Sequence, residues 1–259
     1  MNRTTRTLGR LLGRIPTTWF GDVGLEALLT RARRAPPRGG LRLLFDVDQR
    51  VYLTEGRLAK AYDGGVHAKH RLTRYHDFFV DRIAEDERVL DVGCGIGALA
   101  HDLAERCGAH VTGIEIDASN LAEARQRFPH EKVTYVEGDV TRDTPDGRFD
   151  VIVLSNVLEH LRDRPALLRR LVEATGAGLV LIRVPSFERD WRVPLRREVG
   201  VDWRLDDTHE TEYTLESMRE ELGEAGLGLI ELEARWGELW VQARAEAGGG
   251  GASAASEGG

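Results

Sequence analysis

The chain has 259 residues, of which 41% are hydrophobic and 31% are charged, and its formal net charge is −7. This composition is typical of a globular enzyme, and the acidic balance excludes a protein that coats nucleic acid by charge alone. Its only cysteines, Cys94 and Cys107, exclude a disulfide framework and a paired-cysteine zinc motif, so we expect a cytoplasmic location.

The N-terminal segment is basic. Residues 1–45 hold nine arginines against two acids, Asp22 and Glu26, and residues 1–35 are expected to form one or two helices. A solvated helix face is the expected role of this segment. The alternatives are peripheral membrane contact, a homodimer contact or a phosphate-binding arm. No apolar run reaches the roughly 20 residues that cross a bilayer.

A second helix is expected over residues 41–64, after an interruption by Pro36, Pro37, Gly39 and Gly40. Its spacing predicts a buried face made of Leu43, Leu44, Val47, Val51 and Leu58. We therefore predict that residues 1–74 form a helical N-terminal extension that acts as a lid.

From Val89 onward, short β-rich runs alternate with amphipathic segments. Strands are predicted at 88–92, 110–115, 133–137, 150–155, 178–184, 227–234 and 238–243, and helices at 97–106, 119–128, 164–174 and 214–225. This alternation predicts an α/β, Rossmann-like, doubly wound parallel sheet over residues 75–245. Residues 186–212 are predicted to be an insertion over the active site, and the Gly-rich residues 246–259 to be disordered.

The segment VLDVGCGIG joins the first predicted strand to a helix. Gly93, Gly95 and Gly97 permit a tight turn and the close approach of a ligand, a pattern that dinucleotide sites share. Asp91 separates the two cases, because a carboxylate there would repel a pyrophosphate and attract a ligand with an amino group. S-adenosylmethionine is such a ligand.

Three further polar motifs fall at predicted strand ends. Glu115 lies 22 residues after Gly93, where a carboxylate can accept both hydroxyls of a ribose. Asp139 ends the third strand, and Ser155 and Asn156 end the fourth. Ligands of open α/β sheets bind at these carboxyl ends, so the four motifs are expected to form one site.

In this order, the motifs resemble the class I S-adenosylmethionine-dependent methyltransferase family over about residues 75–243. The resemblance implies a seven-stranded sheet with an antiparallel last strand and S-adenosylmethionine as the cofactor. It implies that Asp91, Gly93 and Gly95 contact the methionyl part, that Glu115 holds the ribose and Asp139 the adenine, and that Asn156 lines the methyl-donor pocket. It also assigns to the cofactor site Cys94, Ile116 and Val140. The wording SNVLEHL is similar to the small-molecule branch of the family.

Methyl transfer to a hydroxyl group calls for a general base. His209 is the first candidate, because Asp206, Asp207 and Glu210 surround it in the sequence, and His160 is the second. A separate cluster is expected to belong to the lid over the cofactor: His67, His70, Tyr75 and His76.

No resident metal is predicted. As an alternative, Glu159, His160 and His209 resemble the metal ligands of the small-RNA 3′-terminal 2′-O-methyltransferases, with Asn156 in place of that family's first glutamate. The remaining nitrogen and oxygen ligands still suit a divalent ion.

The predicted acceptor is a small hydroxylated molecule or a glycan, since sugars stack on aromatic rings. The aromatic residues considered for this role are Trp191, Trp203, Tyr213, Trp236 and Trp240. Nucleic acid is not the expected partner. An RNA methyltransferase and a non-catalytic protein on the same fold are the alternatives.

Overall fold

The structure is a computed structural model that describes residues 20–143 and 146–246. The chain divides into two units, Met1–His67 with Pro194–Trp203, and Ala68–Val193 with Arg204–Gly259. The middle of the predicted insertion therefore belongs to the first unit and its two ends to the second. Much of the predicted basic segment and nearly all of the predicted disordered tail lie outside the described residues. Within those described ranges, no helix is long and apolar enough to cross a bilayer.

The first unit contains a π-helix, Phe20–Leu25, followed by α3 (Glu26–Arg34) and α4 (Pro37–Tyr62), and it includes most of α10 (Arg192–Val199). The interruption predicted at the prolines and glycines is shorter than expected, because α4 begins at Pro37 and includes both glycines. Proline suits a first helical position, where its missing N–H would have had no partner. Gly40 lets α4 approach α3, since a Cβ atom there would lie 2.4 Å from the Ala32 carbonyl oxygen.

The predicted buried face of α4 was also wrong in part. Leu44, Val51 and Leu58 are exposed, whereas Phe45 is buried beneath the Arg196 guanidinium, whose carbon lies 5.0 Å from the ring centroid. Helical spacing shows which side chains share a face. It does not show which face another element covers.

The second unit is built on a seven-stranded sheet in the order β3-β2-β1-β4-β5-β7-β6. The strands are β1 Arg88–Val92, β2 His110–Glu115, β3 Val133–Glu137, β4 Val151–Ser155, β5 Leu179–Pro185, β6 Leu227–Arg235 and β7 Glu238–Ala245. The first five pair in parallel, and β7 is antiparallel to both β5 and β6. The predicted fold class, with its antiparallel last strand, is confirmed.

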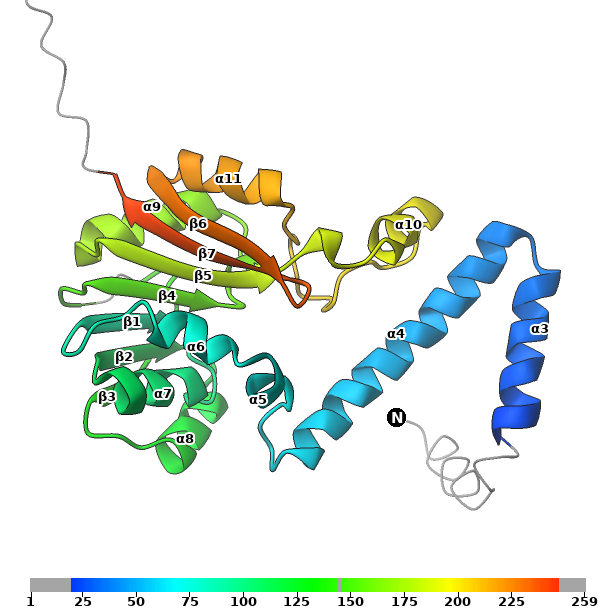
Figure 1. Cartoon of the computed structure of the whole chain (residues 1–259), viewed down its shortest axis with the longest axis horizontal. Coiled ribbons are helices and arrows are strands. Elements are labelled where there is room, and N and C mark those ends of the chain that lie inside the picture. Colours follow the sequence, from blue (N-terminus) through cyan, green and yellow to red (C-terminus); the bar gives the residue numbers. More distant parts are fainter. Residues whose placement is uncertain (1–19, 144–145, 247–259) are drawn as a thin grey trace, which may run out of the picture. The chain divides into compact units, whose positions relative to one another are not determined.

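Helices cover both faces of the sheet (Figure 1). Val89 and neighbours that point the same way pack against α6 (Tyr75–Val80) and α7 (Ala98–Cys107). Leu90 and Val92 point to the other face, toward α9 (Arg164–Thr175) and α11 (Leu215–Glu224). The short α5 (Lys69–Thr73) precedes α6, and α8 (Ala118–Arg127) connects β2 to β3. The core is thus two apolar layers, as the near-continuous apolar strands require.

The five parallel strands end at one edge of the sheet, because parallel strands share a direction. A 3₁₀ turn, Leu158–His160, follows β4, and a second, Phe187–Arg189, follows β5. The predicted motifs at strand ends therefore meet at this edge.

Candidate functional site

The loop between β1 and α7 has the geometry that its glycines allow. Gly93, Gly95 and Gly97 all have positive φ angles, of 66°, 54° and 82°. A Cβ atom at Gly97 would lie 2.4 Å from the Tyr135 hydroxyl oxygen, so this glycine is required for packing. At Gly95, by contrast, no atom lies within 4 Å of an added Cβ. Gly95 therefore faces open space, where a ligand can approach the backbone.

Asp91 is a buried carboxylate beside this loop. It is 2% exposed, and its Oδ2 has no hydrogen-bond partner among the described residues. Burial, and then the charge of Glu115, raise the pKa of Asp91 to about 7. A buried oxygen without a partner is costly, and a ligand ammonium group would satisfy it. This orphaned oxygen fits the amino group of S-adenosylmethionine.

Glu115 ends β2 and braces the same loop. Its Oε2 accepts a hydrogen bond from the Gly95 amide and its Oε1 one from the Asp117 amide, both at 2.9 Å. Each carboxylate oxygen keeps a second lone pair, so two ribose hydroxyls can still be accepted. Cys94 of the loop is buried, and Ile116 beside Glu115 is exposed.

Asp139 caps a turn after β3. Its Oδ1 accepts hydrogen bonds from the Thr141 amide at 3.0 Å and the Thr141 hydroxyl at 2.6 Å, and these bonds lower the pKa of Asp139. The carbonyl of Val140 accepts a hydrogen bond from Arg170. Asp139 and Val140, both predicted for the cofactor site, thus lie at the predicted edge.

Asn156 follows β4 in the left-handed conformation, with φ 59°. Its Nδ2 donates to Glu159 Oε1 at 2.8 Å, and its Oδ1 accepts from the Arg183 guanidinium. Arg183 is 2% exposed, lies 3.6 Å above the Tyr75 ring and is 3.1 Å from Glu238 Oε2. Sequence reasoning missed Arg183, because the only signal was an arginine inside an apolar strand.

Glu159, His160 and His209 come together, each offering one ligand atom within 4.8 Å of the others. The Thr208 hydroxyl donates to Asp206 at 2.7 Å, so it accepts from His160 Nδ1 at 2.9 Å. This bonding leaves the His160 Nε2 lone pair available. Glu159 is fully buried, and its Oε2 has no partner in the described part of the chain.

His209 is held by Glu212, not by the acids nearest to it in the sequence. Its Nδ1 lies 3.1 Å from Glu212 Oε1, and the other Glu212 oxygen pairs with Arg189. A carboxylate can only accept, so in this contact His209 Nδ1 carries the proton and Nε2 the lone pair. Sequence reasoning favoured Asp206, Asp207 and Glu210. Glu212 was missed, although three residues after His209 is within reach of a turn.

The predicted lid cluster is partly assembled. Tyr75 Oη lies 3.1 Å from His70 Nδ1, and His76 Nδ1 lies 2.7 Å from Asp102 Oδ2. The rings of His70, Tyr75 and His76 are in mutual edge contact. His67 belongs to the other unit and is not placed with them.

Comparison with known proteins agrees with this geometry. Residues 65–232 match the family model described as a methyltransferase domain. A ubiquinone biosynthesis O-methyltransferase of Rhodopseudomonas palustris is 33% identical over 155 residues, which are 56% of this chain and 59% of that one. The chain spans about half the length of the curated relatives it matches.

Two solved structures have a similar fold. Magnesium protoporphyrin IX methyltransferase of Synechocystis, with S-adenosylhomocysteine bound, has a TM-score of 0.54 and 19% identity, covering 70% of this chain and 85% of that one. The small RNA methyltransferase HEN1 has a TM-score of 0.55 and 17% identity, and the match covers 69% of this chain and 25% of that one. At these identities, both show the fold alone.

Proposed function

The chain belongs to the class I S-adenosylmethionine-dependent methyltransferases, and on that premise we propose that it methylates a hydroxyl oxygen of a small hydroxylated or glycan-like acceptor. It is an enzyme, and S-adenosylmethionine supplies the activated methyl group. The observation that carries the proposal is the gathering of Glu159, His160 and His209 beside Asn156, at the edge that also holds Asp91. O-methylation is what the name of the Rhodopseudomonas relative states for that protein.

Cofactor binding is proposed to use the strand ends. Asp91 binds the ligand ammonium group, Glu115 the ribose hydroxyls and Asp139 the adenine amine. The open backbone at Gly95 allows the close approach, and Asn156 lines the pocket near the acceptor. Glu115, Asp139 and Asn156 are fixed by hydrogen bonds before any ligand arrives, which reduces the ordering cost of binding.

Proton removal is proposed for His209. Its protonated Nδ1 is held by Glu212, so Nε2 is the nitrogen that can accept a hydroxyl proton. Positive charge that develops on the ring is then stabilised by the buried Glu212. His160, whose ring centroid lies 4.7 Å from that of His209, is proposed to position the acceptor.

A divalent cation at the same residues is the second candidate, and the geometry favours it in one respect. The atoms that the neighbouring side chains leave available are Glu159 Oε2, His160 Nε2 and His209 Nε2. Two imidazole nitrogens and one carboxylate oxygen suit Zn²⁺, Mn²⁺ or Co²⁺ better than Mg²⁺. Such an ion would orient the hydroxyl group and lower its pKa.

One experiment tests the proposed function. Methyl transfer from isotope-labelled S-adenosylmethionine is measured on catechols and on neutral glycans, with and without a chelator. His209→Gln is compared with His110→Gln, which changes an exposed histidine at the opposite edge of the sheet. A loss of at least 100-fold in kcat for His209→Gln alone supports the proposal. Methylation of nitrogen or carbon only would contradict it.

The chelator decides between the two roles. Activity that survives chelation supports His209 as a general base. Activity that chelation removes and Co²⁺ restores supports the cation, and Glu159→Gln should then abolish Co²⁺ binding. We also propose a cytoplasmic location, and a membrane or second-copy contact through the basic N-terminal segment. Cell fractionation tests the location and the membrane contact. Light scattering of the purified protein tests the second-copy contact.

A further inference from the structure

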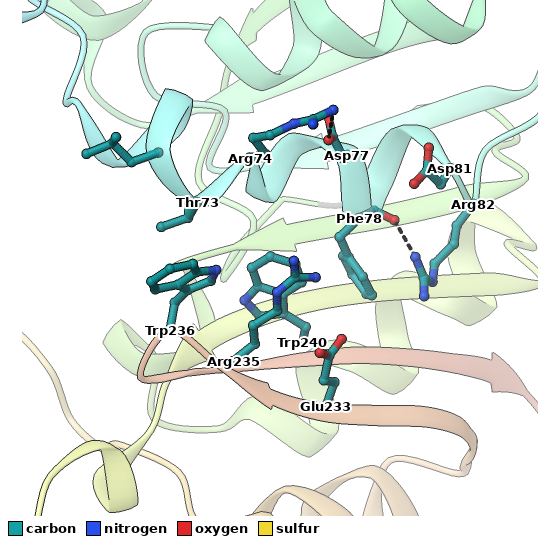
Figure 2. Close-up of a pocket in the computed structure, with 11 residues that line it drawn as sticks. Thr73, Arg74, Asp77, Phe78, Asp81, Arg82, Glu233, Arg235, Trp236 and Trp240 are labelled. Atoms are coloured by element: carbon teal, nitrogen blue, oxygen red, sulfur yellow. Dashed lines mark hydrogen bonds and ion pairs between the residues drawn. The ribbon is translucent and has the colours of Figure 1, made fainter.

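A cavity of about 430 Å³ lies between the α5–α6 corner and the β6–β7 hairpin, within the second unit (Figure 2). This volume falls in the range of small-molecule sites, roughly 300–1,000 Å³. None of its lining residues belongs to the proposed cofactor site or to the Glu159–His160–His209 cluster. The cavity is therefore a separate feature that the methyl-transfer chemistry does not explain.

The hairpin turn at its rim has an unfavourable residue. Arg235 pairs with Glu238, and the two residues between them, Trp236 and Gly237, have φ angles of 54° and 77°. Two positive φ angles define a type I′ turn, which favours Asn-Gly. A bulky side chain is disfavoured in this conformation. Trp236 is also 65% exposed, so little burial offsets the strain.

A second strained residue lines the same cavity. Arg74, between α5 and α6, has φ 52°. In the described part of the chain, the non-glycine residues with positive φ are Arg74, Asp86, Asn156 and Trp236. Two of these four line this cavity, and a third lies at the proposed catalytic edge. Strained backbone of this kind concentrates at ligand sites, because the folded state retains it for function.

The lining is polar and balanced in charge. It contains three arginines and three acids: Arg74, Arg82, Arg235, Asp77, Asp81 and Glu233. Arg74 pairs with Asp77 at 2.7 Å, and Arg82 donates to Glu231 at 2.5 Å. The others, Arg235, Asp81 and Glu233, make no side-chain hydrogen bond or ion pair with the described residues. The cavity thus offers donors and acceptors in balance, without a net attraction for an anion.

Aromatic rings form one side of the cavity. The Arg235 guanidinium carbon lies 4.9 Å from the ring centroid of Trp240, which is itself buried against Phe78. Figure 2 shows the Trp236 ring across from Thr73, with Arg235 over Trp240. Trp236 is therefore the tryptophan of this site whose face remains open to a ligand.

We infer that this cavity binds a sugar unit, a neutral ring with many hydroxyl groups. The C–H face of the sugar would lie on the Trp236 indole, which is rigid and loses little entropy on binding. Its hydroxyls would accept hydrogen bonds from Arg235 and donate them to Glu233, which line the same cavity. An anionic aromatic ligand is disfavoured, because Asp81 and Glu233 would repel it.

The site is connected to the catalytic edge through the backbone. The Ser186 amide donates to the Gly237 carbonyl at 3.0 Å, and Ser186 directly follows β5. One part of the inference, that the bound sugar belongs to the methyl acceptor, rests on the proposed function. Sugar binding at the cavity itself does not require that function.

The test uses the full chain without cofactor. Saturation-transfer NMR is recorded with the methyl glycosides of glucose, galactose, mannose and rhamnose, and with 3,4-dihydroxybenzoate. Trp236→Asn is compared with Trp191→Asn, which changes a similarly exposed tryptophan outside the cavity. S-adenosylhomocysteine binding by each protein is measured in parallel.

We expect saturable binding of at least one glycoside, weakened at least tenfold by Trp236→Asn and unchanged by Trp191→Asn. Trp236→Asn should also raise the melting temperature by about 2–4 °C, because Asn-Gly relieves the turn. The inference is overturned if no glycoside binds, if only the dihydroxybenzoate binds, or if Trp236→Asn leaves glycoside binding intact. If the unaltered chain does not bind S-adenosylhomocysteine, the proposed function is contradicted instead.

Discussion

His209 Nδ1 lies 3.1 Å from Glu212 Oε1, and both side chains are buried. The other oxygen of Glu212 is paired with Arg189. This arrangement holds one ring orientation and one tautomer of His209.

Glu212→Gln is therefore expected to lower kcat about tenfold to 100-fold, with little change in the dissociation constant of S-adenosylhomocysteine. It should also reduce the free energy of unfolding by about 3 kcal/mol, because Arg189 loses a buried partner. Steady-state kinetics and urea unfolding check the two effects. An unchanged kcat would show that Glu212 has only a structural role.

Asp91→Asn should weaken S-adenosylhomocysteine binding about tenfold to 100-fold, since a charged hydrogen bond contributes about 1.5–3 kcal/mol. Isothermal titration calorimetry measures the change. Asp117→Asn, at an exposed helix cap nearby, is the control and should bind normally. Equal loss in both variants would remove Asp91 from the methionyl site.

Binding should depend on pH through Asp91. Burial raises the pKa of this carboxyl to about 7, so below pH 7 the free protein holds a proton that the ligand ammonium must displace. Affinity for S-adenosylhomocysteine should fall about tenfold from pH 8 to pH 6. The same shift means that the free protein loses stability as pH rises from about 4 to 7. In Asp91→Asn, the pH dependence of affinity should vanish.

Two glycines of one loop should respond differently to alanine. Gly97→Ala is expected to lower the melting temperature strongly, because the new Cβ meets the Tyr135 ring and φ is 82°. At Gly95 the new Cβ meets no neighbouring atom, so Gly95→Ala should lower the free energy of unfolding by only about 1 kcal/mol, through backbone strain. It should also weaken cofactor binding. Calorimetry on both variants checks the order, and a larger stability loss in Gly95→Ala would contradict it.

We expect Tyr75 to contribute to stability through its ring rather than through its hydroxyl group. Tyr75→Phe keeps the ring beneath the Arg183 guanidinium and removes the hydroxyl group that contacts His70, so binding and stability should change little. Tyr75→Leu removes the stacking and is expected to cost about 2 kcal/mol or more in stability. Thermal unfolding separates the two variants. Equal losses would assign the effect to the hydroxyl group.

The sequence by itself determined the seven strands of the second unit, its helices α7, α8, α9 and α11, and the positions of Asp91, Glu115, Asp139 and Asn156 at strand ends. These predictions succeeded because they depend on local properties. Apolar runs and glycine turns mark where a strand ends, and parallel strands must end at one edge. The family assignment followed from the same motifs.

Only the tertiary structure decided which side chains become partners. Glu212 rather than a nearer acid holds His209, and Arg183 crosses from β5 to Asn156 and Tyr75. Phe45 is buried, although the helical spacing predicted a buried face made of its neighbours. Such choices depend on which faces of separate elements meet, and periodicity within one element carries no information about its neighbour. The strain at Trp236 likewise arises from strand pairing, which sets the φ angles of the turn.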